Sequence, residues 1–360
     1  MTPEEPATRG RDQLFGFPPA STSPPTDEPR AEPTAAAPAP PSTDEPRAEP
    51  TATAPPTRAR STTPAPTIGP SEPVGRRASF LIVLGAYAIA AGVAALVAAV
   101  VGSATPLLTV LVADLAATVV IFAFSRAFNN TSVYDAYWSV VPPVIALYLY
   151  WVHQPGTDVL RQVLVLGLVW AWSIRLTANW ARGWPGLDHE DWRYLDMRTN
   201  GKPYWLQSFF GLHLFPTLQV YLGCLALYPA LTVGTNGFGP LDVLALLVTG
   251  GAIIIEFVAD EQLRSFNETK LPGEICAVGL WRWSRHPNYF GELSFWWGLW
   301  LFGIAADPVW WWTIVGPLAM TAMFVFASIP MMDERSAQRR PGFEAYAART
   351  SMLVPLPPKD

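Results

Sequence analysis

Charged residues, cysteine and histidine are all scarce in this 360-residue sequence. Charged residues make up 15% of the chain, whereas about a quarter of the residues in a typical soluble domain are charged. The two cysteines, Cys224 and Cys276, form no CxxC or metal-ligand spacing, and the four histidines are scattered along the chain. We therefore predict neither a disulfide framework nor a metal site. The net charge of −5 also argues against a nucleic-acid-binding protein.

Several common nucleotide-binding and catalytic motifs are missing as well. The sequence contains no GxGxxG, no Walker loop, no HExxH and no GxSxG. These absences remove support for the common soluble dinucleotide-binding folds and for zinc hydrolases. What remains is a chain in which half of the residues are hydrophobic, including 16 tryptophans that all follow residue 137. Such a composition favours a membrane protein.

The N-terminal segment differs from the rest of the chain. Residues 1–78 contain about half of the prolines, no tryptophan and few aliphatic residues, and the decapeptide TDEPRAEPTA occurs at 26–35 and again at 43–52. A segment of this kind buries too little apolar surface to offset the entropy lost on ordering. We predict a disordered Pro/Ala/Thr-rich tail over 1–78 and a membrane domain over 79–355.

Long apolar segments follow this tail. A helix needs about 20 apolar residues to cross the hydrocarbon core of a bilayer. The sequence predicts an all-α, polytopic membrane helix bundle of seven or eight transmembrane helices, of which the third and seventh are short. The predicted spans are 79–101, 106–125, 138–153, 159–177, 206–230, 240–258, 291–306 and 309–330.

Lysine and arginine are distributed asymmetrically between the connections. With eight spans, the basic residues fall on one side, in the segment before the first span, in the loops at 178–205 and 259–290, and in the tail after 331. The positive-inside rule then places both termini in the cytoplasm. Arg161 is the exception, and we expect its side chain to extend outward to the interface.

A few ionisable residues lie where the bilayer makes them costly. Asp114 falls in the middle of the second span, and intramembrane acids are often functional, although an interhelical salt bridge explains it equally well. Glu256, Asp260 and Arg264 share one helix face at i, i+4 and i+8. The same two interpretations remain open for them.

The stretch RWSRHPNYFGE, residues 282–292, precedes one of the most apolar segments. Pro287 suits the first position of a helix, so the seventh span should begin there, with its free N–H groups and positive dipole end facing the cytoplasm. This arrangement predicts an anion site. An interfacial belt of tryptophan and arginine is the alternative, but it leaves unexplained the other polar residues at this helix start, Asn288, Tyr289 and Glu292.

Two further polar segments are expected to meet this helix start. The loop at 179–198 mixes charges of both signs with aromatic residues, which suits a packed loop. The C-terminal segment at 333–355 has an amphipathic stretch, in which Tyr346 and Arg349 lie three residues apart. We predict that this stretch covers the site as a lid.

The block GLWRWSRHPNYFGELSFWWG, residues 279–298, resembles the signature of the steroid 5-alpha-reductase-like C-terminal domain family, in its broad bacterial branch. Three further blocks are similar in the same order, at 181–198, 256–266 and 333–355. The resemblance covers about 110–355. Two positions depart from the family pattern, because Leu263 stands where lysine is common and Ser351 where proline is common.

The resemblance implies an all-helical membrane oxidoreductase that binds NADPH from the cytoplasmic side. Such an enzyme reduces a carbon–carbon double bond in a lipophilic steroid-, isoprenoid- or enone-like substrate. The residues implied for the cofactor site are Arg264, Arg285, His286, Asn288, Glu292, Tyr346 and Arg349. No metal is implied.

A proton donor must accompany the hydride, because an acid that polarises the substrate carbonyl stabilises developing enolate charge. The sequence does not single out one group for this role. The catalytic candidates are Tyr289, Asp114 and Asp135, with Tyr134 as a further possibility.

Two other functions remain open. Membrane methyltransferases of the isoprenylcysteine carboxyl type use S-adenosylmethionine and share an Arg-His-Pro helix start, but they favour tryptophan where this chain has Glu292. A non-catalytic membrane protein that retains a nucleotide site is the second alternative.

Overall fold

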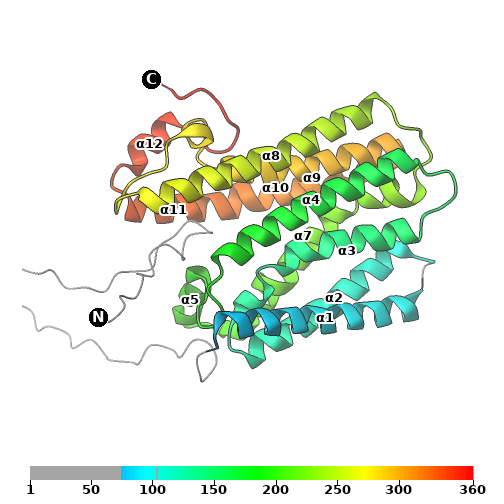
Figure 1. Ribbon diagram of the computed structural model, residues 1–360, viewed down its shortest axis with the longest axis horizontal. Helices are drawn as coiled ribbons and strands as arrows, with labels where there is room; N and C mark the ends of the chain where they lie inside the picture. The colour runs from blue at the N-terminus through cyan, green and yellow to red at the C-terminus, as the bar shows by residue number, and fades with distance from the viewer. Residues whose placement is uncertain (1–73, 103, 360) are drawn as a thin grey trace, which may run out of the picture. The chain divides into compact units, whose positions relative to one another are not determined.

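The computed structural model describes residues 74–102 and 104–359, and over these residues the chain is helical (Figure 1). Within them the only extended pairing is an isolated bridge between Ser284 and Ser351. The predicted all-α fold class is therefore confirmed. Most of the predicted disordered tail, 1–78, lies outside the described residues. Its last three positions already belong to the first helix, α1 (Arg76–Val101).

Each predicted span corresponds to a helix or to a continuous helical run. The helices and runs are α1, α2 (Pro106–Ala127), α3 (Tyr137–Trp151), α4 (Val159–Gly183), the run Tyr204–Val233, α8 (Pro240–Thr269), α9 (Pro287–Ala306) and the run Pro308–Arg339. Six of them are long and apolar enough to cross a membrane. The other two are α3, with 15 residues, and α9, with 20, which are the spans that the sequence predicts to be short. The chain is thus an integral membrane protein.

The two composite runs contain several kinds of helical turn. The run Tyr204–Val233 comprises α6 (Tyr204–Gln207), the π-helical turns η2 (Ser208–Leu214), α7 (Phe215–Cys224) and η3 (Pro229–Val233). The run Pro308–Arg339 comprises η5 (Pro308–Ile314), α10 (Val315–Met323), η6 (Phe324–Ser328) and α11 (Ile329–Arg339). Short helices outside the spans are η1 (Thr131–Tyr134), α5 (Trp192–Thr199), η4 (Gly279–Arg282) and α12 (Phe343–Arg349).

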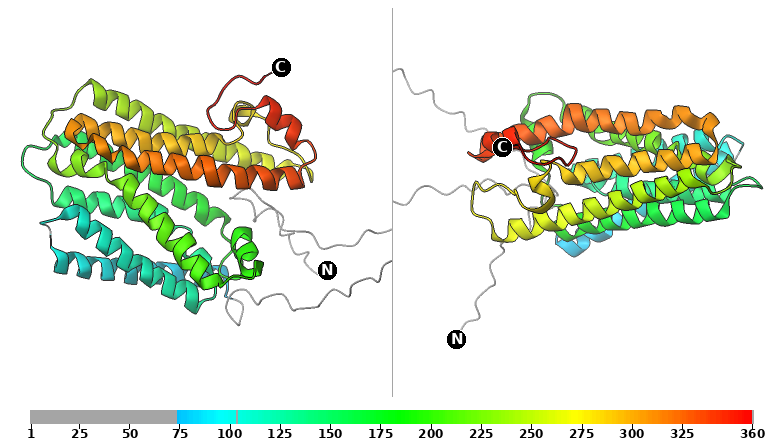
Figure 2. Two further views of the ribbon diagram at one scale, coloured as in Figure 1. Left: turned by 180° about the vertical axis from the view of Figure 1, so that it is seen from behind. Right: turned by 90° about the horizontal axis from the view of Figure 1, so that it is seen from above.

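In the membrane domain, α3, α4 and α7 lie between α1 and α2 on one side and α8 to α11 on the other (Figure 1, Figure 2). Helices α8 and α9 run side by side at close range because glycines of α9 face α8. A Cβ atom at Gly291 would lie 2.8 Å from the Cβ atom of Glu256, and one at Gly298 would lie 2.9 Å from the backbone nitrogen of Thr249. Any larger residue at these two positions would push the helices apart.

Two apolar clusters form the interior. The larger one joins α3, α4, α7, α8 and α9, and includes Trp172 stacked on Phe295 with ring centroids 4.7 Å apart. The smaller one joins α1, α2 and α3 to the α4–α5 loop through Trp180 and Trp184. At this end of α1, the Arg76 guanidinium donates to the carbonyl oxygens of Ala181 and Trp184 at 2.7 and 2.8 Å, which fixes α1 to that loop.

Arg161 does not extend outward to the interface as expected. Its side chain is fully buried, and its Nε lies 2.6 Å from Oδ1 of Asp242. The same guanidinium donates to the carbonyl oxygens of Asn236 and Gly237. The ion pair joins the beginnings of α4 and α8. Arg161, the exception to the distribution of the other basic residues, therefore has a structural role.

Candidate functional site

The segment that begins with Arg282 folds as the sequence predicts. Helix α9 starts at Pro287 with His286 at the preceding cap position. The C-terminal tail runs alongside the residues just before this start. The backbone N–H of Arg285 donates to the carbonyl oxygen of Ser351 at 2.8 Å, and Ser284 Oγ donates to that of Leu353 at 2.7 Å. Because Ser351 contributes its carbonyl oxygen, a proline there would make the same contact.

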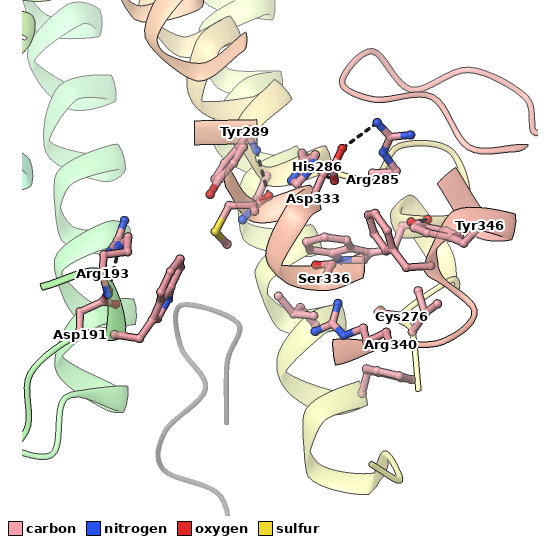
Figure 3. Close-up of a pocket in the computed structure, with 18 residues that line it drawn as sticks. Asp191, Arg193, Cys276, Arg285, His286, Tyr289, Asp333, Ser336, Arg340 and Tyr346 are labelled. Carbon is pink, nitrogen blue, oxygen red and sulfur yellow. Dashed lines mark hydrogen bonds and ion pairs between the residues drawn. The ribbon is translucent and has the colours of Figure 1, made fainter. Parts of the chain in front are cut away.

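A cleft of about 130 Å³ opens at this end of α9 (Figure 3). Residues of α5, α8, α9, α11 and α12 line it, together with the segment before η4. Five predicted site residues are among them, and these are Arg285, His286, Asn288, Tyr289 and Tyr346. The structure therefore gathers at one cleft the helix start, the 179–198 loop and the C-terminal tail, as predicted.

Asp333 of α11 is at the centre of the polar contacts in the cleft. Its two carboxylate oxygens accept from Arg285 at 2.8 Å and from His286 Nε2 at 2.9 Å (Figure 3). Arg285 also donates to the carbonyl oxygen of Ala347 at 2.9 Å. Because an ionised carboxylate only accepts hydrogen bonds, Nε2 of His286 carries a proton. Arg285 and His286, which the resemblance implies for the cofactor site, are therefore already engaged by an acid that the sequence did not single out.

Two other arginines face the cleft with donors to spare. Arg193 of α5 lies 2.7 Å from Asp191 through its Nε atom only. Arg340, just after α11, lies beside Cys276 (Figure 3), and no carboxylate among the described residues lies within ion-pair distance of it. Burial lowers the pKa of the Arg340 guanidinium and raises that of the Cys276 thiol. An arginine stays charged despite such a shift, so Arg340 offers a free cation to an anionic ligand.

Aromatic side chains hold the helix start and the tail in place. The rings of His286 and Tyr289 are stacked with centroids 5.2 Å apart, and Tyr289 contacts Phe324 edge-on. The Tyr346 hydroxyl donates to the carbonyl oxygen of Trp281, which ties α12 to η4. Burial raises the pKa of Tyr346, so this hydroxyl remains a donor at neutral pH. The predicted lid is thus built by α12, with Tyr346 on its inner side.

Three predicted cofactor residues lie outside the cleft lining. Arg264 turns away toward Asn179, while its neighbour Leu263 lines the cleft. Arg349 is exposed at the end of α12. Glu292 is buried, and it accepts from the indole N–H groups of Trp172 at 2.9 Å and Trp296 at 2.8 Å.

Buried charges lie directly beneath the cleft. Arg175 of α4 pairs with Glu256 and, at 2.9 Å, with Asp260, both on α8. Asn288 connects this cluster to the cleft, because its side-chain amide donates to Asp260 at 3.3 Å. The predicted face of Glu256 and Asp260 therefore lies against α4 and α9. These contacts support the interhelical salt-bridge interpretation of those two residues.

A second cavity, of about 280 Å³, lies between α1, α2 and α3 and contains Asp114. Its lining is almost entirely apolar, with alanines from α1 and valines from α3. Asp114 is only 5% exposed, and the Tyr137 hydroxyl donates to its Oδ1 at 2.8 Å. Its Oδ2 has no hydrogen-bond partner among the described residues. Sequence analysis did not identify Tyr137 as part of a site.

Asp135 lines neither cavity. It follows η1 and accepts from the Tyr194 hydroxyl at 2.6 Å, which joins the α2–α3 connection to α5. Burial raises its pKa to about 7.

Within residues 74–102 and 104–359, no group of three or more His, Cys, Asp or Glu residues could hold a metal ion.

Comparison with known proteins places the chain in a family. Residues 121–350 match the family DUF1295, described as proteins of unknown function. The uncharacterized protein C594.04c of Schizosaccharomyces pombe is 27% identical over 253 residues, which cover 63% of this chain and 73% of that protein. No solved structure matches the chain. Because this relative comes from a fission yeast, assignment to a bacterial branch stays a prediction. The chain belongs to the DUF1295 family, which is related to the steroid 5-alpha-reductase-like membrane proteins.

Proposed function

We propose that this protein is an integral membrane oxidoreductase that uses NADPH to reduce a carbon–carbon double bond in a lipophilic substrate. The observation that carries the proposal is the presence of two cavities of opposite character in one membrane domain. One is a cleft with spare cationic donors at a helix start, and the other is an apolar cavity that contains a buried acid. Because the two linings share no residue, hydride transfer requires the nicotinamide and the substrate to meet within the helix bundle.

The residues at the cleft fit the charged part of a dinucleotide. Arg340 and Arg193 offer guanidinium donors suited to phosphate, and the first turn of α9 adds the positive end of a helix dipole. Trp192 and Trp281 add flat apolar surfaces. The volume of about 130 Å³ is below the roughly 300–1,000 Å³ of most ligand pockets. A whole dinucleotide therefore requires the α5 wall and the α8–α12 wall to separate.

NADPH would supply the hydride, and the chain must supply the acid. Among the predicted candidates Asp114 suits this role best, together with Tyr137, which the sequence did not single out. The hydroxyl of Tyr137 is oriented by Asp114, and the second oxygen of Asp114 is buried without a hydrogen-bond partner among the described residues, beside an apolar cavity. A positioned acid there would polarise or protonate a substrate oxygen or carbon. Tyr289 lies at the cleft and Asp135 outside both cavities, so neither reaches the apolar site.

The site residues also bear on the methyltransferase alternative. S-adenosylmethionine carries a sulfonium cation and no phosphate, so the two arginines of the cleft with spare donors, Arg193 and Arg340, favour a phosphate-bearing cofactor over it. Glu292, which distinguishes the two families in sequence, lies inside the helix bundle and not in the cleft. The arginine arrangement is therefore the stronger discriminator in this structure.

In the proposed orientation, the protein lies in a bacterial inner membrane and both of its termini are on the cytoplasmic side. The cleft then faces the compartment that contains NADPH. The distribution of arginine and lysine supports this orientation, because the connections 154–158 and 231–239 contain neither residue. Cysteine labelling of Asp188→Cys in intact cells tests it. This exposed loop position should be protected from an impermeant reagent, and labelling would reverse the proposed orientation.

The proposed reaction is tested with purified protein in lipid nanodiscs, a membrane lipid extract and NADPH deuterated at the transferable hydrogen. A lipid product should gain one deuterium and one solvent proton. Extracts of a deletion strain should contain the unsaturated precursor in excess. Binding of NADPH without oxidation in the presence of any unsaturated lipid would favour the non-catalytic alternative. Methyl transfer from labelled S-adenosylmethionine would favour the methyltransferase.

A further inference from the structure

A file of hydrogen-bonded polar groups leads into the bundle from the end of the domain that carries the α4–α5 loop. It begins at Glu190, which is paired with Arg198, and the half-buried Tyr204 hydroxyl donates to this carboxylate at 3.1 Å. The Tyr204 hydroxyl oxygen lies 2.7 Å from Thr131 Oγ1. Thr131 Oγ1 in turn lies 3.0 Å from Ser208 Oγ. Loop, η1 and η2 residues thus form a continuous outer segment of the file.

His213 continues the file on the π-helical turns of η2. It is fully buried, and its Nδ1 lies 2.9 Å from the carbonyl oxygen of Ser208. A carbonyl oxygen only accepts, so Nδ1 carries the proton. Nε2 is then the acceptor for the hydroxyl of Ser125 on α2, at 3.0 Å. The contacts of His213 therefore fix one neutral tautomer.

The inner segment of the file ends at the apolar cavity. One turn beyond His213, Thr217 Oγ1 lies 2.8 Å from both the Tyr134 hydroxyl and Thr118 Oγ1. Thr118 lies one turn from Asp114 on α2, and its side chain also interacts with the Tyr137 hydroxyl. The rings of Tyr134 and His213 are in contact, with centroids 4.8 Å apart. This step has no direct hydrogen bond among the described residues, so proton transfer across it requires a water molecule or a change of rotamer.

Helix packing alone does not require this arrangement. Valine or alanine fills the same space as threonine or serine without a polar group to desolvate, and a buried hydroxyl gains little net stability. Here the buried groups come from α2, η1 and the run Tyr204–Val233. They follow one another from a half-buried tyrosine to an intramembrane acid with one oxygen that has no hydrogen-bond partner among the described residues. Their shared feature is that each can both accept and donate a proton.

We propose that this file conducts protons from the half-buried Tyr204, beside the buried Glu190, to the Asp114–Tyr137 pair. The proposal rests on the function proposed above. Each reduction of a carbon–carbon double bond adds one hydride and one proton, and it leaves the oxidised nicotinamide and a deprotonated acid. The cavity lining contains Tyr87, Thr109 and Tyr148 but no carboxylic acid besides Asp114, so the file restores this acid from water after each turnover.

The test is to replace Thr217 by valine, which removes one hydroxyl of the inner segment and keeps the side-chain shape. Thr232→Val is the matched control, because Thr232 is buried on the same run but donates only to the carbonyl oxygen of Leu149. Thr217→Ser is the rescue variant, since it keeps a hydroxyl. Melting temperature and NADPH affinity establish that all three variants are folded.

The measurement is rapid mixing of NADPH-loaded protein in nanodiscs with vesicles of the membrane lipid extract, following NADPH absorbance in H₂O and D₂O. The first turnover uses the proton already on the acid, so it should be the same in Thr217→Val as in wild type. Later turnovers should slow by about tenfold or more and show a larger solvent isotope effect, because reprotonation becomes limiting. Thr232→Val and Thr217→Ser should resemble wild type.

Each contrary outcome is distinct. Equal later turnovers in Thr217→Val and wild type overturn the proton file and leave the reductase intact. A first turnover slowed as much as the later ones places Thr217 in substrate binding or in the chemical step, and also overturns it. If wild-type protein oxidises no NADPH with any lipid fraction, the proposed function fails, and the file fails with it.

Discussion

The two cavities differ in the polarity of their lining and in how much of that lining lies within the segment that matches the DUF1295 family. The cleft at the start of α9 is polar, and all of its lining residues fall within the matched segment 121–350. The apolar cavity takes two of its three walls from α1 and from the part of α2 that precedes residue 121, including Asp114. Under the proposed function, the shared segment would bind the cofactor and the first two helices would select the substrate.

The largest expected effect separates the two cavities by function. Asp114→Asn and Tyr137→Phe should lower the rate of lipid reduction by about 10²-fold or more, as loss of a positioned acid does. NADPH affinity should stay unchanged, because neither residue lines the cleft. Tyr148→Phe is the control, since this tyrosine lines the same cavity without a hydrogen bond to Asp114. A comparable loss in Tyr148→Phe would remove the special role of the pair.

The next effect concerns the cleft. Arg340→Ala should raise the dissociation constant of NADPH about 10- to 100-fold, because it removes a charge-assisted hydrogen bond worth about 1.5–3 kcal/mol. Arg349→Ala should have little effect, since that side chain is exposed and outside the lining. Isothermal titration in nanodiscs measures both. If Arg349→Ala weakens binding more than Arg340→Ala does, the cofactor lies against the outer side of α12.

A third substitution tests whether Glu292 belongs to the cleft or to the bundle. Glu292→Ala should lower the melting temperature and change NADPH affinity little, because it leaves two buried indole N–H groups without an acceptor. Each such group costs about 1–3 kcal/mol. Glu344→Ala, at an exposed position, serves as the control. Loss of NADPH binding in an otherwise stable Glu292→Ala protein would return this residue to the cofactor site.

The smallest effect is a pH dependence at Asp135. Burial raises its pKa from 3.8 to about 7 in the folded protein, so between these values the unfolded chain releases a proton that the folded protein retains. Raising the pH through this window therefore destabilises the fold. Asp135→Asn keeps an acceptor for Tyr194 and cannot ionise, so its melting temperature should fall less from pH 4 to pH 7. Parallel curves for the two proteins would contradict the raised pKa of Asp135.

Sequence patterns predicted the spans and the helix start because both are local. Apolar runs of bilayer length define the helices, and Pro287 fixes where α9 begins. The contacts between distant segments were not predictable. Asp333 and Arg340 follow the last apolar run and meet Arg285 and Cys276 only through the packing of α11 on α9 and the segment before η4.

The residues placed outside the cleft show where helical spacing misleads. Asn288 and Glu292 do share a face, as their spacing requires, but that face points at α8 and α4. Only Asn288, at the helix start, reaches the cleft, whereas Glu292 is one turn deeper among tryptophans. Leu263 lines the cleft, but the side chain of the next residue, Arg264, points to another side of α8 and contacts Asn179 of α4. Helix orientation depends on tertiary packing, which spacing does not encode.

The central claim is that the cleft at α9 binds an anionic nucleotide, and cofactor titration of the purified protein tests it most directly. Trp192 and Trp281 line the cleft, so their fluorescence reports on its occupation. The account predicts saturable quenching by NADPH that is weakened in Arg340→Ala, and no response to S-adenosylmethionine. A protein in nanodiscs that ignores NADPH, or that responds to S-adenosylmethionine instead, would contradict it.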